Sequence, residues 1–150
     1  MTDKLKNLPP VSQMMRDANM MAKKQFGQNF LFDLNLTGRI ARSVPDIDKL
    51  PVVEVGPGPG GLTRALLMAG AKRVVAVEMD KTAEPILSQI MAVSEGRLNV
   101  IYGDALKTDF SKTITSVISR TIHNAPFARD ASRQNSHISP SVKTPQFGHG

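Results

Sequence analysis

The chain has 150 residues, a formal net charge of +6 at pH 7 and no cysteine. This length allows one domain with a sizeable core, and the lack of cysteine excludes disulfides and thiolate metal sites. No apolar run approaches membrane-spanning length, and the polar first six residues do not form a signal-peptide core. The basic charge favours an anionic partner, nucleic acid above all, although it could also serve only to keep the protein in solution.

The first helical pattern follows Pro9-Pro10, which can open a helix. Its apolar residues recur at near-helical spacing and predict a packing surface: Val11, Met14, Met15, Ala18 and Met21. Lys23 and Lys24 come next and are candidates for contact with an RNA backbone, with a solvated surface pair as the alternative. If they bind RNA, the affinity should fall steeply with salt.

Residues 25–33 form an aromatic-flanked polar turn, in which Phe30 and Leu31 are expected to anchor the turn to the body of the protein. Asn35 is a candidate N-cap for a second helix. That helix would bury one apolar face, made by Leu36, Ile40 and Val44.

The central stretch, residues 52–63, reads VVEVGPGPGGLT. Its β-branched start predicts a buried strand, and the glycines that follow allow a sharp turn close to a ligand. Residues 62–69 then predict a helix, which Gly70 is well placed to end. Strand, glycine turn and helix are the start of a Rossmann-type nucleotide-binding unit.

The glycine spacing alone leaves two cofactors open. Gly56, Gly58 and Gly61 satisfy the dinucleotide pattern G-x-G-x-x-G, which is a weak signal by itself. Pro57 and Pro59 lack the backbone N–H groups that a pyrophosphate would need in this turn. S-adenosylmethionine carries no phosphate and is therefore favoured over a nicotinamide dinucleotide. A turn that only packs a helix on the sheet is the third interpretation.

Acidic residues accompany each of three predicted strands. Glu54 precedes the first glycine of the turn and suits the methyltransferase form, in which an acid helps to position the methionine end of the cofactor. Glu78 follows a strand at residues 73–77, close to where an acidic side chain takes ribose hydroxyls. Asp104 follows a strand at residues 98–102 and can accept a hydrogen bond from an adenine amino group. Together the three acids predict an S-adenosylmethionine site.

Three segments together resemble the ribosomal RNA adenine dimethyltransferase family: residues 28–31, 53–63 and 103–106. This family includes the bacterial small-subunit enzymes, their mitochondrial transcription-factor-B relatives and the erythromycin-resistance methylases. The lead-in at residues 8–10 is more similar to the first two branches than to the third. The resemblance extends from about Leu8 to Phe110.

The resemblance implies transfer of methyl groups from S-adenosylmethionine to adenine N6 in small-subunit ribosomal RNA. By resemblance, Asn29 and Leu31 close over the cofactor, and Gly56 touches its methionine part. The full set of implied cofactor residues is Asn29, Leu31, Glu54, Gly56, Gly58, Glu78 and Asp104. We also expect a monomer in the cytoplasm, with the mitochondrial matrix as the alternative, and no membrane partner.

From Ser111 the chain departs from the family pattern and becomes rich in Ser and Thr, without a clear helix or strand period. We therefore expect an α/β methyltransferase domain reduced to its N-terminal part, residues 1–110, and an irregular tail over residues 111–150. The helical C-terminal domain of the family would be absent. A frameshift, alternative splicing or an error in the gene model is one hypothesis for this tail.

A tetrapeptide in the tail, Asn124-Ala125-Pro126-Phe127, resembles the family's catalytic motif. The Asn124 side-chain oxygen and the next backbone carbonyl can accept the two amino hydrogens of adenine and draw its nitrogen toward tetrahedral geometry. The ring of Phe127 can stack on a flipped-out base. In-line methyl transfer then depends on positioning and needs no metal. Ala125 departs from the usual Leu, so a chance match is the alternative.

A second class of function also fits the sequence. A non-catalytic RNA-binding or ribosome-assembly protein could retain only the cofactor-binding half of such an enzyme. Measured methyl transfer to ribosomal RNA separates the two functions.

Overall fold

The computed structural model describes residues 3–20 and 32–123, with side chains as far as Ser119. The chain divides into two compact units, Met1–Ile114 and Thr115–Gly150. The elements of the first unit are, in order, α1 (Asp3–Lys6), α2 (Val11–Asp17), α3 (Leu34–Ser43), β1 (Val52–Val55), α4 (Gly61–Met68), β2 (Val74–Glu78), the 3-10 turn η3 (Lys81–Ala83), α5 (Glu84–Val93), β3 (Leu98–Tyr102) and the 3-10 turn η4 (Ala105–Lys107). A last helix, α6 (Phe110–His123), begins in this unit.

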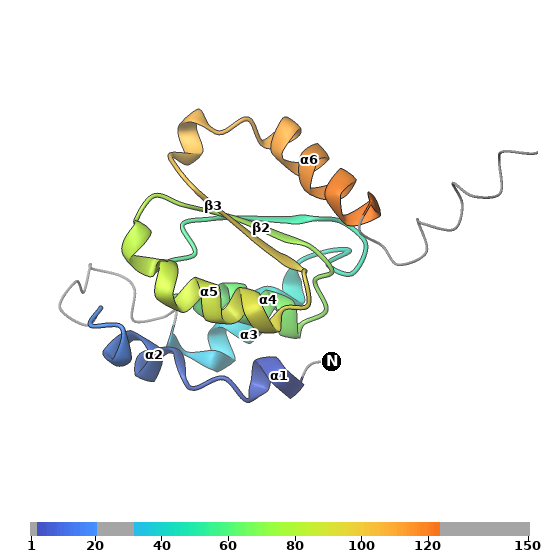
Figure 1. The fold of residues 1–150 in the computed structure, drawn as a ribbon. Helices are drawn as coiled ribbons and strands as arrows, with labels where there is room; N and C mark the ends of the chain where they lie inside the picture. Colours follow the sequence, from blue (N-terminus) through green and yellow to red (C-terminus); the bar gives the residue numbers. More distant parts are fainter. Residues whose placement is uncertain (1–2, 21–31, 124–150) are drawn as a thin grey trace, which may run out of the picture. The chain divides into compact units, whose positions relative to one another are not determined.

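The three strands form one parallel sheet in the order β1-β2-β3. Val52 of β1 pairs with Val74 of β2, which in turn pairs with Leu98 of β3. Helices α1 to α5 lie on one face of this sheet (Figure 1). The α/β fold and the strand–turn–helix order predicted from the sequence are confirmed.

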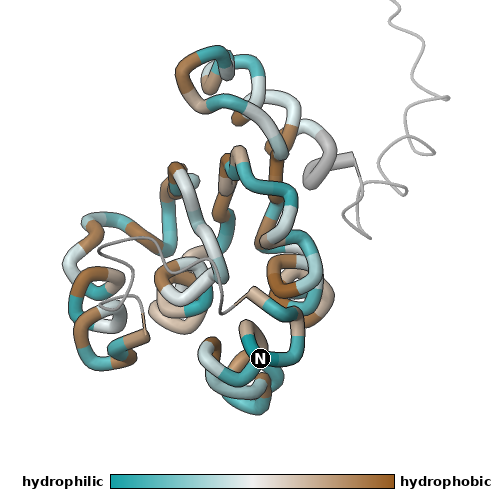
Figure 2. The backbone as a smooth tube through the Cα atoms, turned by 90° about the vertical axis from the view of Figure 1, so that its left-hand side faces the viewer, coloured by the Kyte–Doolittle hydropathy of each residue, from teal (hydrophilic) through white to brown (hydrophobic). Residues whose placement is uncertain are grey.

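The core lies between the sheet and these helices. Figure 2 shows hydrophobic and hydrophilic stretches alternating around the helical turns, so each helix has an apolar side to bury. Side chains from β2 and β3 meet side chains from α2, α4 and α5 in one cluster, which includes Met14, Leu67, Val74, Ile86, Ile90 and Leu98. Val11, Met14 and Met15 of α2 are buried, as their helical spacing predicted. Gly70 follows α4 with φ +106°, a left-handed conformation that ends the helix.

Helix α3 begins and packs differently from the prediction. Its N-cap is Asp33, whose carboxylate accepts the backbone N–H groups of Asn35 and Leu36 at 2.9 and 3.2 Å. Asn35 therefore lies inside the first turn and does not cap it. The buried positions are Thr37 and Ala41, whereas Ile40 is exposed. Small side chains on this face let α3 lie close to its neighbours, and a pattern based on large apolar residues missed it.

The prediction of an irregular tail from Ser111 is wrong for residues 111–123, which belong to α6. Asp109 begins this helix: its carboxylate accepts the N–H of Lys112 at 3.1 Å, and its carbonyl accepts that of Thr113 at 3.0 Å. Apolar residues at 110, 114, 117 and 118 have helical spacing. The many Ser and Thr residues have modest helix propensity and hid this period.

Two arginines tie the helices of the first unit together through backbone carbonyls. Arg64 of α4 is 8% exposed, and its guanidinium donates to the carbonyls of Pro9, Leu8 and Lys6 at 2.7, 2.9 and 3.2 Å. Arg97 donates through Nη1 to the carbonyls of Leu67 and Ala71, the free end of α4, at 2.9 and 3.0 Å. A cation at a helix C-terminus also offsets the negative end of the helix dipole.

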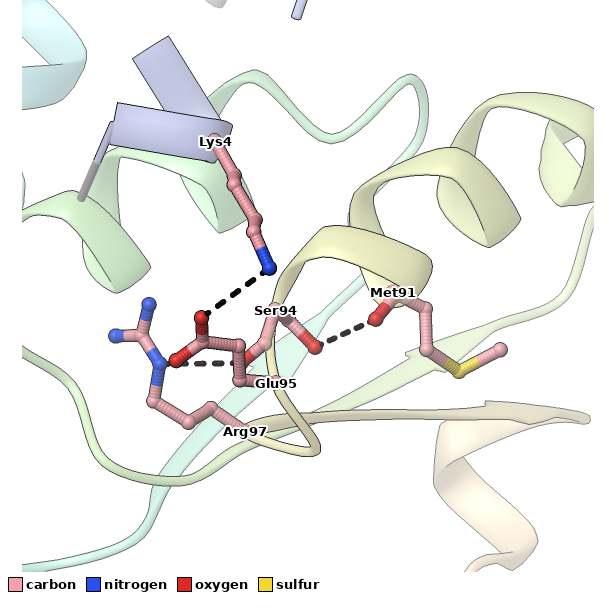
Figure 3. Close-up of polar contacts among 5 residues, drawn as sticks. All are labelled: Lys4, Met91, Ser94, Glu95 and Arg97. Atoms are coloured by element: carbon pink, nitrogen blue, oxygen red, sulfur yellow. Dashed lines mark hydrogen bonds and ion pairs between the residues drawn. The ribbon is translucent and has the colours of Figure 1, made fainter. Parts of the chain in front are cut away.

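The turn between α5 and β3 makes a second tether to α1. Lys4 pairs with Glu95 at 3.7 Å, and Arg97 Nε donates to the Ser94 carbonyl at 3.1 Å (Figure 3). The Ser94 hydroxyl donates to the Met91 carbonyl at 2.8 Å and closes the end of α5. The exposed ion pair adds little stability, so Arg64 is the main polar anchor of the N-terminal segment. Among the described residues, no helix is long and apolar enough to cross a bilayer.

Replacing Arg64 by Ala should lower the free energy of unfolding by about 2–4 kcal/mol, because three part-buried hydrogen bonds from a charged donor are lost. Arg39→Ala removes an exposed arginine of α3 and should change it by less than about 0.5 kcal/mol. Urea unfolding of both variants measures the difference. Equal effects of the two substitutions would mean that Arg64 does not anchor residues 6–9.

Candidate functional site

The carboxyl ends of the three strands meet at one edge of the sheet. The N–H of Gly56 donates to the Val77 carbonyl, and that of Gly103 donates to the Glu78 carbonyl, both at 2.9 Å. These bonds continue the parallel ladder one residue beyond β1 and β3. The turns that follow the strands therefore lie next to one another, which is where open α/β sheets bind ligands.

Glu78, the last residue of β2, organises this edge. Its side chain is 7% exposed, and Oε2 accepts the N–H of Gly58 at 2.8 Å. Oε1 accepts the N–H of Asp80, also at 2.8 Å. Each carboxylate oxygen keeps a further lone pair, so Glu78 can still accept hydrogen bonds from hydroxyl groups of a ligand. The sequence predicted that this acid contacts a ligand, but it did not predict the hydrogen bond from the glycine turn.

Glu54 of β1 is buried beside it. Its Oε2 accepts the hydroxyl proton of Thr63 at 2.6 Å, and Thr63 is fully buried in the first turn of α4. The pKa of Glu54 is raised to about 7, chiefly by burial; the Thr63 hydrogen bond lowers it, and the nearby Glu78 adds a smaller upward shift. A cation placed at this carboxylate would favour its ionised form.

Thr63 is a site residue that sequence reasoning missed. The sequence pattern places it in a helix, nine positions after Glu54 and directly after the glycine turn, without indicating its partner. Its hydroxyl is one buried group that can satisfy a buried carboxylate at this place. An acid before the glycine turn and a hydroxyl residue in the helix after it could have indicated this hydrogen-bonded pair.

The glycine turn has two different requirements for glycine. Gly56 has φ +69°, and a Cβ there would meet nothing within 4 Å, so open space adjoins the backbone. Gly60 has φ +82°, and a Cβ there would collide with the side chain of Ile90 on α5. The first glycine leaves room for a ligand, and the second lets α5 approach the start of α4.

Asp104 follows β3 at the same edge, as predicted. Its Oδ1 accepts the N–H of Leu106 at 2.9 Å, and its carbonyl accepts the hydroxyl proton of Thr108 at 2.8 Å. These bonds close the turn η4 and hold the carboxylate just past the strand. The side chain of Leu106 is 96% exposed beside it.

The other predicted site residues lie outside the described residues: Asn29, Leu31, Lys23, Lys24, Asn124 and Phe127. Within the described ranges, no group of three His, Asp or Glu side chains could hold a metal ion.

The fold and the site together define the class of protein domain. A parallel sheet with a glycine turn after β1 and acids at the ends of β1, β2 and β3 is the nucleoside-binding half of a Rossmann-type domain. The sequence profile of the ribosomal RNA adenine dimethylase family matches residues 19–139. The chain belongs to this family. The match continues past Phe110, where the sequence analysis placed the end of the resemblance, and it includes residues 124–127.

Curated relatives agree with this assignment. Proteins named ribosomal RNA small subunit methyltransferase A are 50% identical over 121 residues in Afipia carboxidovorans, 53% over 121 in Agrobacterium fabrum and 57% over 104 in Mesorhizobium japonicum. The aligned parts cover 81%, 80% and 69% of this chain but 43%, 44% and 37% of the relatives. The chain thus spans less than half the length of the relatives that it matches.

The stability of the protein should depend on pH through Glu54. Its folded pKa of about 7 lies above the ordinary value of 4.5. Folding therefore favours the protonated form of Glu54. Its contribution to the free energy of unfolding is fully present below pH 4.5 and is lost as the pH rises through 7. The gap between the two values corresponds to about 3 kcal/mol.

Urea unfolding at pH 4.5 and pH 8 should show this loss in the wild type and not in Glu54→Gln, which keeps an acceptor for Thr63 but cannot ionise. Glu84→Gln, at an exposed position of α5, should follow the wild type. An equal pH dependence in Glu54→Gln and the wild type would place the cause elsewhere.

Proposed function

We propose that this chain is the cofactor-binding part of an S-adenosylmethionine-dependent ribosomal RNA adenine N6-dimethyltransferase that acts on small-subunit RNA. The observation that carries the proposal is the pair of buried carboxylates, Glu54 and Glu78, which bind Thr63 and the glycine turn at the carboxyl edge of the sheet. Membership of the ribosomal RNA adenine dimethylase family supports the reaction.

The residues fit S-adenosylmethionine in three places. Glu78 has lone pairs left for two ribose hydroxyls, because each oxygen is engaged by one N–H group. Glu54 is buried and costly to ionise, so it would gain from the positive charge at the methionine end. Asp104 would accept from the adenine amino group. When bound, the cofactor supplies a methyl group activated by its sulfonium sulfur.

The assignments to residues outside the described ranges rest on the sequence. Asn29 and Leu31 would close over the cofactor, and both fall within the part matched to the family. Asn124 would accept the amino hydrogens of the target adenine, and Phe127 would stack on its ring. Their inclusion in the family match supports this reading over a chance occurrence.

The RNA partner is inferred from charge and from the relatives. The net charge of +6 suits a polyanion, and Lys23 and Lys24 would contact its backbone. The relatives are named for the small ribosomal subunit, which supports the same substrate for this chain. We place the protein in the cytoplasm as a monomer, with the mitochondrial matrix as the alternative.

The described sheet supplies one side of the crevice that the reaction needs. Strand β1 has a partner on one edge only, and Val55 at its end is 62% exposed. In a doubly wound sheet the ligand lies where the strand order reverses, which requires strands on both sides of β1. The described residues therefore supply no wall on the other side of the target adenine. We expect this 150-residue chain to bind the cofactor weakly and to transfer methyl groups slowly.

Calorimetry with S-adenosylmethionine should show binding that Glu78→Ala weakens by about 1–3 kcal/mol, the range of a lost charged hydrogen bond. Glu78→Gln retains one carbonyl acceptor and should lose less. Glu84→Ala, at an exposed position of α5, should bind like the wild type. Unchanged binding in Glu78→Ala would contradict the assignment of Glu78 to the ribose. Binding of NAD in preference to S-adenosylmethionine would favour an oxidoreductase instead.

Methyl transfer to small-subunit RNA should be far slower with this chain than with a full-length relative, and radioactive S-adenosylmethionine measures both rates. Comparable rates would overturn the expected inactivity. If Asn124→Ala then abolished the activity, residues 124–127 would be the working catalytic motif. Cofactor binding without any transfer, together with RNA binding, would support the assembly-protein alternative.

A further inference from the structure

We infer that a second ligand site, for an organic phosphate monoester, lies in a cavity between α1, α3 and α4. The cavity has a volume of about 370 Å³ and is lined by Lys6, Leu34, Thr37, Gly38, Arg42, Arg64, Ala65, Met68 and Ala69. None of these is a predicted cofactor residue. The lining residues of α4 start three residues after Gly61, so the cavity lies along the helix from the glycine turn.

The cavity is strongly positive. Lys6, Arg42 and Arg64 line it, and no Asp or Glu does. The ion pairs found among the described residues involve none of these three cations. Asp33, which precedes the lining residue Leu34, is engaged as the N-cap of α3. Three cations that line one cavity, without an ion-pair partner among the described residues, favour an anion at this place.

Arg64 gives the strongest indication. Its three carbonyl partners are neutral dipoles, so they satisfy N–H groups but leave the positive charge uncompensated. Its Nε is buried and has no hydrogen-bond partner. Burial also lowers the pKa of Arg64, because desolvation disfavours the charged form. An anion in the cavity would compensate the charge.

The shape of the cavity fits a phosphate with an attached organic group. Arg42 lies against Gly38, where an added Cβ would approach its Nη1 to 3.0 Å, so the missing side chain makes room for the guanidinium. Leu34, Ala65 and Met68 add apolar lining to the same cavity. A volume of about 370 Å³ is within the range of small-ligand pockets and larger than a phosphate ion needs.

The charge selects the class of anion. Three cations complement a phosphate monoester, which carries close to two negative charges, better than a carboxylate or an internal phosphodiester with one. Arginine also suits phosphate because its planar fork can donate two parallel bonds. Two sources carry this group: a free mononucleotide and the 5′-phosphorylated end of an RNA chain. This inference does not rest on the proposed cofactor.

The test is NMR titration of the full chain with uridine 5′-monophosphate, with uridine as the control without phosphate. Backbone amides of Gly38 and Ala65 should shift saturably with the monophosphate and not with uridine, while Gly58 and Gly60 in the glycine turn should not shift. Arg42→Gln should weaken binding about tenfold, the order of one charged hydrogen bond. Arg39→Gln removes the same charge from the same helix outside the cavity and should change it less than about twofold.

A second arm compares RNA oligonucleotides of one sequence with a 5′-phosphate and with a 5′-hydroxyl. Tighter binding of the phosphorylated oligonucleotide that requires Arg42 would identify RNA as the source. Binding that requires Arg42 only with the mononucleotide would identify a free nucleotide as the source. Equal losses in Arg42→Gln and Arg39→Gln would overturn the site, as would shifts confined to the glycine turn or no saturable shift. Binding of S-adenosylmethionine, measured separately, distinguishes this failure from failure of the proposed function.

Discussion

The hydrogen bond from the Gly58 N–H to the Glu78 carboxylate is the contact on which the site depends. It joins residues 20 positions apart and links the turn after β1 to the end of β2. A glycine-rich turn has many accessible conformations, and a buried carboxylate that accepts its N–H selects one of them. The carboxylate itself is held by Asp80 and by its place at the end of a fully buried strand. Fold and site therefore share one residue.

Helix α4 transmits this order to the rest of the first unit. Its first turn carries Thr63, which holds Glu54, and the next residue is Arg64, which holds the N-terminal segment. Its last carbonyls bind Arg97. Both of its ends and its middle are thus fixed by polar contacts that reach other elements. A change in the position of α4 would move the glycine turn, the N-terminal helices and the start of β3 together.

Two buried ionisable groups, Glu54 on β1 and Arg64 on α4, differ in how burial affects them. Glu54 can avoid its ionisation cost by taking up a proton near neutral pH, and its pKa reflects this. Arg64 cannot lose its proton under ordinary conditions, so it relies on carbonyl dipoles. The environment of Glu54 is suited to a ligand with a positive charge. The charge of Arg64 is not balanced by an acid among the described residues and would be stabilised by a ligand with a negative charge.

The sequence by itself determined the strands, the glycine turn and the acids at the strand ends. These features are local: β-branched runs form strands, glycine supplies left-handed turns, and parallel strands bring their carboxyl ends to one edge. The positions of Glu54, Glu78 and Asp104 at the strand ends could be predicted because each lies a fixed distance from such a signal. The start of α6 at Asp109 was also local, but Ser and Thr masked its period.

Only the tertiary structure decided which partners these side chains take. Thr63 could not be assigned to Glu54, nor Arg64 to the carbonyls of residues 6–9, because those pairs depend on where α4 lies against β1 and the N-terminal segment. The same packing sets the pKa of Glu54, since burial is its largest cause. A linear pattern records neighbours along the chain, whereas desolvation and long-range hydrogen bonds arise from neighbours in space.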